Sequence, residues 1–150
     1  TNHYVFKDNL RGIKTGENIN IAFENHCAPN SEIIDCNFEG TMRFLAGPLT
    51  IKNTVFRSPA IWITSISNVE GPLPNNIVFE NCTFDPYDNF PSFLHISSSH
   101  PELTWKAGDY RLENIKFINC TGLKKSNFGN VDNFDPSSPN YITVSPALTK

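Results

Sequence analysis

The sequence predicts an all-β protein, a single domain over residues 1–150 that folds as a right-handed parallel β-helix, a solenoid of about five coils. Two observations indicate this fold. Phenylalanine (12 residues), proline (11) and asparagine are frequent, whereas alanine, leucine and methionine, the strong helix formers, are sparse. In addition, one short pattern of apolar and polar residues recurs along the chain, which is typical of repeat proteins.

The recurring pattern is apolar-x-apolar-x-Asn, and each copy is expected to be a strand that ends in asparagine. The copies end at Asn25, Asn53, Asn81 and Asn119. The first two intervals are 28 residues each and the third is 38 residues. We interpret these intervals as successive turns of a solenoid, with a ten-residue insertion in the last one.

The alternation within each copy predicts which side chains face the core. Ile77 and Phe79 fall on the same side as Asn81, because side chains of a strand alternate with period two. The asparagines are therefore expected to face inward and to bond the turns above and below. Asn81 and Asn119 also begin Asn-Cys-Thr tripeptides, which match the glycosylation acceptor pattern. We expect no sugar there, because an inward asparagine is inaccessible.

Residues after these asparagines are also expected to stack. Cys82 and Cys120 fall at one ladder position, and Phe56 and Phe84 fall at another. The four cysteines form no C-x-x-C pair, so we interpret them as small packed side chains.

Further strands are predicted at residues 33–34, 61–63 and 93–96, separated by runs rich in proline, glycine, serine and asparagine that supply the corners. Seven or more short strands with turn signals also suit a β-sandwich. The repeated 28-residue interval argues against that alternative.

Composition excludes several classes of function. The net charge is −3 and the basic residues are scattered, so nucleic acid is not an expected partner. No apolar run approaches the roughly 20 residues that a membrane helix needs, so no membrane partner is expected. The sequence contains no phosphate-binding loop, no nucleophile elbow and no H-E-x-x-H motif. We expect no cofactor.

The segment Ile77-Val-Phe-Glu-Asn-Cys-Thr-Phe84 resembles the coil signature of the pectate-lyase-like superfamily of β-helical proteins. The segment from Asn53 to Asn81 resembles coils of β-helical glycoside hydrolases. The resemblance covers roughly residues 20–122. It implies a carbohydrate-active, secreted or periplasmic protein, part or all of a glycoside hydrolase. Two alternatives stay open: a non-catalytic glycan-binding or spike module, and a polysaccharide lyase.

Hydrolysis of a glycoside requires two carboxyl groups about 5 to 9.5 Å apart. The candidates are the loop acids Glu70, Asp85, Asp88 and Asp109. The alternative is that they are solvated turn residues, which we expect to be the commoner case.

Four side chains are candidates for binding a sugar: Trp62, Tyr87, His95 and Trp105. Trp62 lies between two isoleucines, so it points outward if those two point inward. An outward tryptophan offers a flat surface to a sugar ring, and the alternative is packing beneath a loop.

No metal site is expected, because the oxygen-rich runs at residues 85–89 and 132–135 lack a third ligand run and suit turns. We expect the chain to be a fragment of a longer solenoid, since it shows no capping helix. Exposed strand edges would then meet the rest of that chain or a second copy in a homo-oligomer.

Overall fold

The computed structural model describes residues 5–6, 21–25, 30–45, 47–64, 74–86, 90–98 and 111–149, the first two ranges by backbone alone. These residues form an all-β structure with three parallel sheets and two short 3₁₀ helices, Lys125–Asn127 and Val131–Phe134. The expectation of an all-β protein is thereby confirmed. Among the described residues, no helix has the length and apolar character needed to cross a membrane.

Each sheet collects strands from distant parts of the chain. The six-stranded sheet contains, in spatial order, β1 (Val5–Phe6), β3 (Ser31–Ile34), β6 (Leu49–Lys52), β9 (Ile77–Glu80), β12 (Lys116–Ile118) and β13 (Thr143–Ser145). The three-stranded sheet contains β10 (Thr83–Phe84), β7 (Val55–Arg57) and β4 (Asn37–Glu39). The four-stranded sheet contains β11 (Leu94–Ile96), β8 (Ile61–Ile63), β5 (Thr41–Phe44) and β2 (Ile21–Asn25).

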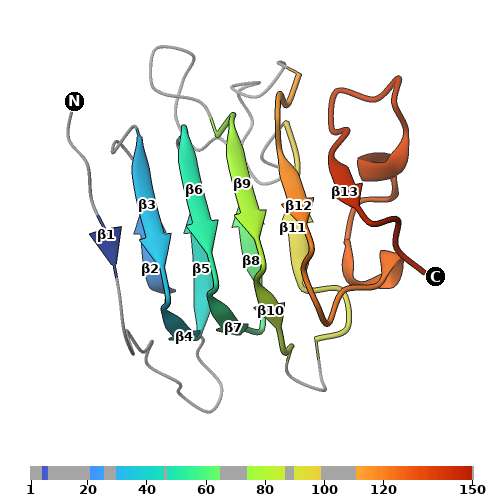
Figure 1. The fold of residues 1–150 in the computed structure, drawn as a ribbon. Helices are drawn as coiled ribbons and strands as arrows, with labels where there is room; N and C mark the ends of the chain where they lie inside the picture. Colours follow the sequence, from blue (N-terminus) through green and yellow to red (C-terminus); the bar gives the residue numbers. More distant parts are fainter. Residues whose placement is uncertain are drawn as a thin grey trace.

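The chain visits the three sheets in a fixed order, six-stranded, then three-stranded, then four-stranded (Figure 1). We call one such passage a circuit. β3, β4 and β5 form one circuit, β6, β7 and β8 the next, and β9, β10 and β11 the one after. Every strand pairs in parallel with the equivalent strand of a neighbouring circuit. This topology is compatible with a β-helix-like fold.

Two residues form the corner between the six-stranded and the three-stranded sheet in every circuit. The first is Asp35, Asn53, Asn81 or Asn119, and each of these has a positive φ between 51° and 58°. Asparagine and aspartate tolerate this left-handed conformation better than most residues. The backbone N–H of each corner residue donates to the next circuit, for example from Asn81 to the Ile118 carbonyl oxygen at 2.9 Å.

The predicted 28-residue repeat is wrong for the first copy of the pattern. The strand that ends at Asn25 joins β5 in the four-stranded sheet, whereas β3 is the partner of β6. Asp35, not Asn25, is therefore equivalent to Asn53. Measured between corner residues, the successive circuits are 18, 28 and 38 residues long. The same apolar-x-apolar-x-Asn pattern occurs in two different sheets, because the strands of both sheets need apolar side chains that face the core.

The prediction of inward asparagines is also wrong. Ile77 and Phe79 are fully buried as expected, but Asn81 is exposed, and so are Asn53 and Asn119. The left-handed conformation breaks the alternation at the corner, so the next residue turns inward instead; Cys82 is 1% exposed. Inaccessibility therefore gives no reason to reject glycosylation at Asn81 or Asn119.

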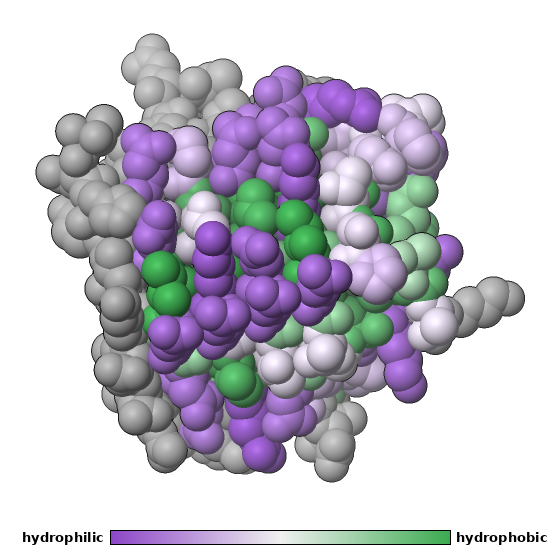
Figure 2. Space-filling view, viewed as in Figure 1, coloured by the Kyte–Doolittle hydropathy of each residue, from purple (hydrophilic) through white to green (hydrophobic). Residues whose placement is uncertain are grey.

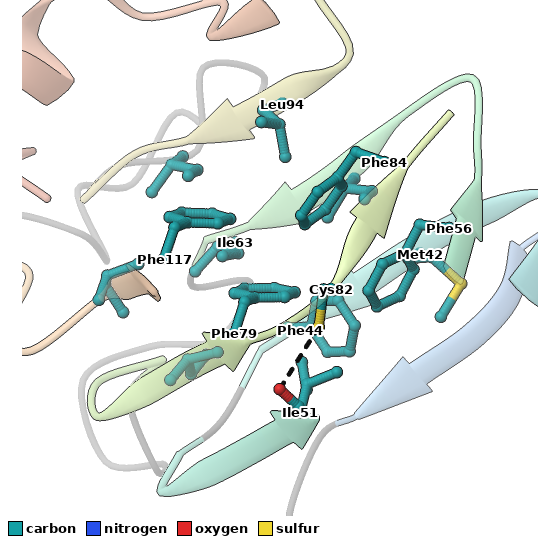
Figure 3. Packing of buried hydrophobic residues seen from close by; sticks show 14 of the residues in the cluster. Met42, Phe44, Ile51, Phe56, Ile63, Phe79, Cys82, Phe84, Leu94 and Phe117 are labelled. Atoms are coloured by element: carbon teal, nitrogen blue, oxygen red, sulfur yellow. Dashed lines mark hydrogen bonds between the residues drawn. The ribbon is translucent and has the colours of Figure 1, made fainter. Parts of the chain in front are cut away.

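Phenylalanines from all three sheets fill the core (Figure 3). Phe56 and Phe84 stack at 5.3 Å between ring centroids, which confirms the stacking expected for this pair. Phe79 of the six-stranded sheet stacks on Phe117 at 4.6 Å and meets Phe44 of the four-stranded sheet edge to face. The core thus lies between the sheets, and like side chains lie upon like.

The outer face of the six-stranded sheet is mainly hydrophilic, with smaller apolar areas between the polar side chains (Figure 2). Outward positions on neighbouring strands carry opposite charges, as where Lys52 lies 3.6 Å from Glu80. Both side chains are accessible to solvent, at 46% and 37% exposed, so this ion pair adds little to stability.

The last described segment packs against the final circuit. Phe128 forms a bridge with Leu94 of β11 and meets Phe117 edge to face at 5.6 Å. The fully buried Asn133 donates from its side chain to the carbonyl oxygens of Ile96 and Asn140. These contacts fix residues 128–133 beside β11, where they border the candidate site.

Candidate functional site

The outer face of the four-stranded sheet carries a row of three large side chains. Arg43 of β5 is in register with Trp62 of β8, and Trp62 is in register with His95 of β11. The residues on either side of each are apolar and buried, so strand alternation directs these three outward. The outward orientation predicted for Trp62 is thereby confirmed.

Trp62 and His95 form a stacked pair. Their ring centroids lie 4.3 Å apart and the planes are inclined by 21°. Neighbouring parallel strands are about 4.8 Å apart, so register partners on one face meet at this distance. The facing sides of the two rings cover each other, so the pair offers a ligand its ring edges and outer ring faces, and two strands hold the rings in place.

A cavity of about 260 Å³ lies beside this pair. That volume is slightly below the roughly 300 Å³ at which ordinary ligand pockets begin, so the cavity suits one part of a larger ligand. Its lining consists of Trp62, Thr64, His95, Ile96, Ser97, Gly129 and Asn130.

Gly129 keeps the cavity open next to His95. Its backbone N–H donates to the Leu94 carbonyl oxygen at 2.7 Å, and Phe128 before it is paired with Leu94. Gly129 therefore lies next to His95, on the segment adjacent to β11, and extends the outward-facing row. A β-carbon on Gly129 would lie 3.1 Å from His95 Nδ1, closer than most such contacts. The missing side chain thus leaves one side of the imidazole open.

Burial lowers the pKa of His95 below its usual range, because desolvation disfavours the charged imidazolium. The ring is therefore neutral at neutral pH and can donate from one nitrogen and accept at the other. Asn130 adds an amide whose oxygen accepts from the Asp132 backbone N–H at 3.1 Å. The site combines aromatic ring edges and one open side of the imidazole with neutral hydrogen-bonding groups.

The other candidate residues do not join this pair within the described structure. Asp85 follows β10 at the edge of the three-stranded sheet, is exposed, and lies 3.8 Å from Arg57. It does not line the cavity. The remaining predicted residues lie outside the described residues: Glu70, Tyr87, Asp88, Trp105 and Asp109.

Besides Ile96 of β11, four lining residues were not predicted from the sequence: Thr64, Ser97, Gly129 and Asn130. Ile-Trp-Ile in β8 and Leu-His-Ile in β11 share one apolar-x-apolar pattern, which makes Trp62 and His95 candidate register partners but does not fix the register. No repeat marks the other four residues, since they lie at strand ends and in the last segment.

A second hollow of about 310 Å³ borders the start of β12 and the segment before β13, with Arg111, Lys116 and Tyr141 in its lining. Arg111 already donates to the Pro136 carbonyl oxygen at 2.6 Å.

Over the described part of the chain, no three histidine, cysteine or acidic side chains gather closely enough to hold a metal ion.

Comparison of the chain with protein-family models, with curated proteins and with solved structures found no match.

Proposed function

We propose that this protein is a right-handed parallel β-helix of the pectate-lyase-like type and that it binds a glycan or polysaccharide on the outer face of the four-stranded sheet. The observation that carries the proposal is the stacked pair of Trp62 and His95 beside an open cavity. The regular order of parallel strands supports the fold assignment.

The chemistry of the site suits a sugar ring. A pyranose has apolar faces and a rim of hydroxyl groups, so it pairs with a flat aromatic surface and with neutral donors and acceptors at the edge. The outer faces and edges of Trp62 and His95 supply the aromatic contact, and Thr64, Ser97 and Asn130 supply the polar groups. A polymer that crosses the strands would meet the next outward side chain about every 4.8 Å.

Glycoside hydrolysis would require two carboxyl groups at this same cavity. The described lining contains no acidic residue, and Asp85 is turned to Arg57 at the three-stranded sheet. Glu70, Asp88 and Asp109 lie outside the described residues. We therefore propose that the function is recognition of the glycan. The same experiment also tests whether the glycan is cleaved. A glycan ligand also fits the secreted or periplasmic location that we propose.

The test begins with a glycan array, followed by titration of each bound glycan with the purified chain. Trp62→Ala should weaken binding by about 10-fold or more, or roughly 1.4 kcal/mol, because it removes one of the two rings and the support that it gives to His95. Val78→Ala is the matched control, since Val78 points outward from the six-stranded sheet and should bind within about twofold of wild type.

Chromatography of the bound glycan after incubation reports cleavage. Shorter products would extend the proposal to a hydrolase or lyase and direct substitutions to Glu70, Asp88 and Asp109. The recognition proposal fails if no glycan binds, or if Trp62→Ala binds as tightly as Val78→Ala.

A further inference from the structure

Cys82 and Cys120 occupy the same corner position in neighbouring circuits. Each follows a left-handed asparagine, and the Thr121 backbone N–H donates to the Cys82 carbonyl oxygen at 2.9 Å. Neighbouring parallel strands lie about 4.8 Å apart. A disulfide needs α-carbons about 4.4 to 6.8 Å apart, so the backbone already has the required spacing.

The two side chains also point the same way. Cys82 turns into the core, and its sulfur lies 3.4 Å from the Ile51 carbonyl oxygen (Figure 3). The Cys120 sulfur lies 3.5 Å from the carbonyl oxygen of Phe79. Phe79 is the register partner of Ile51, so the two contacts are equivalent. Cys82 and Cys120 are register partners, since Glu80 pairs with Ile118 before them and Thr83 bridges Thr121 after them. Parallel side chains keep their β-carbons about one strand spacing, roughly 4.8 Å, apart, slightly beyond the roughly 3.5 to 4.5 Å of a disulfide. Bond formation therefore requires a small local shift at this corner but no rearrangement of the sheets.

We propose that Cys82 and Cys120 form a disulfide that joins two circuits of the fold when the protein is in an oxidising environment. This inference does not depend on the proposed glycan site. It replaces the interpretation of these two cysteines as packed side chains only.

The two thiols differ in a way that orders the reaction. The neighbouring Cys82 thiol lowers the pKa of Cys120, which is partly buried, whereas the Cys120 thiol and burial raise the pKa of Cys82. Cys120 is thus the thiolate that attacks a small external disulfide and releases one thiolate. The Cys82 sulfur then attacks the Cys120 sulfur, loses its proton and releases the second thiol. Two protein thiols are oxidised and one external disulfide is reduced.

Cys36 provides an internal control. It follows Asp35 and so occupies the same corner position, but Thr54 lies between it and Cys82 in the ladder. Two strand spacings amount to about 9.5 Å, beyond the roughly 7 Å that a disulfide can bridge. Cys36 should remain a thiol while Cys82 and Cys120 react. Cys27 lies outside the described residues.

The cross-link would close the longest circuit, since residues 83–119 lie between the two cysteines. That segment includes β11 and therefore His95. A loop of this length constrains the unfolded chain strongly, so oxidation should raise the melting temperature by about 10 °C.

The test uses the full 150-residue chain, reduced and then incubated with glutathione disulfide. Free thiols titrated after denaturation should fall from four to two. A tryptic map without reduction should show peptide Ser58–Lys106 joined to Phe117–Lys124, about 2 Da lighter than the sum of the two. Cys36→Ser should keep this joined peptide, and Cys120→Ser should lose it.

The map of the wild-type chain decides the question even if Cys120→Ser does not fold. Four free thiols, titrated after denaturation of the chain that was treated with oxidant while folded, would overturn the proposal. So would a peptide joined to Thr15–Arg43, which contains Cys27 and Cys36.

Discussion

Replacement of Phe79 by alanine is the sharpest test of the core. Phe79 is 0% exposed, and its ring centroid lies between 4.6 and 5.8 Å from the rings of four other phenylalanines. Buried Phe→Ala substitutions cost about 3 to 5 kcal/mol, and each aromatic pair adds about 0.5 to 1.5 kcal/mol. Because few neighbours can collapse into the space, we expect a loss of about 5 kcal/mol in the free energy of unfolding.

Urea unfolding followed by far-ultraviolet circular dichroism measures this loss. Val78→Ala is the control, because Val78 is adjacent in β9 but points outward, and it should cost about 1 kcal/mol or less. A loss below about 2 kcal/mol for Phe79→Ala, or one equal to that of the control, would show that Phe79 does not lie between the sheets.

Two further predictions concern backbone strain and pH. Gly122 has φ +79°, and a β-carbon there would lie 2.0 Å from the Phe84 carbonyl oxygen, so Gly122→Ala should lower the free energy of unfolding by at least about 2 kcal/mol in thermal melts. The pKa of His95 is lowered in the folded state, so the unfolded state binds the proton first as pH falls. Stability should therefore drop as pH decreases through about 6.5 and level off below the folded pKa. His95→Gln should show a flatter dependence in urea unfolding at pH 7.5 and 5.5, and equal slopes would contradict this reasoning.

Strand identity could be predicted from sequence, because alternation of apolar side chains is local. The inward orientation of Ile77 and Phe79 was predicted correctly. So was the outward orientation of Trp62, which lies between the inward Ile61 and Ile63. Register could not be predicted equally well. The strand that ends at Asn25 has the same apolar-x-apolar-x-Asn pattern as β6 and β9 but belongs to another sheet. No local signal in the sequence separates these strands.

The corner asparagines show a second limit. Periodicity continues in the sequence through Asn81, whereas the backbone enters the left-handed region there and the side chain is exposed. Asparagine tolerates a positive φ, which favours such a turn. This tolerance does not reveal at which residue the alternation of inward and outward side chains stops. For the site, Trp62 and His95 were each predicted to bind sugar, but their contact depends on a register that spans 33 residues.

The constant two-residue corner has a consequence for how this fold can change. Between the six-stranded and three-stranded sheets, the connection stays at two residues, while the connection from β5 to β6 has four residues and that from β11 to β12 has nineteen. Lengthening such a connection costs only about 0.6 kcal/mol per doubling. One residue added at the Asn81–Cys82 corner would instead turn Phe84, the inward side chain of β10, outward. New peptides could therefore be grafted between β5 and β6 by protein engineering, whereas the corner should accept substitution but not insertion.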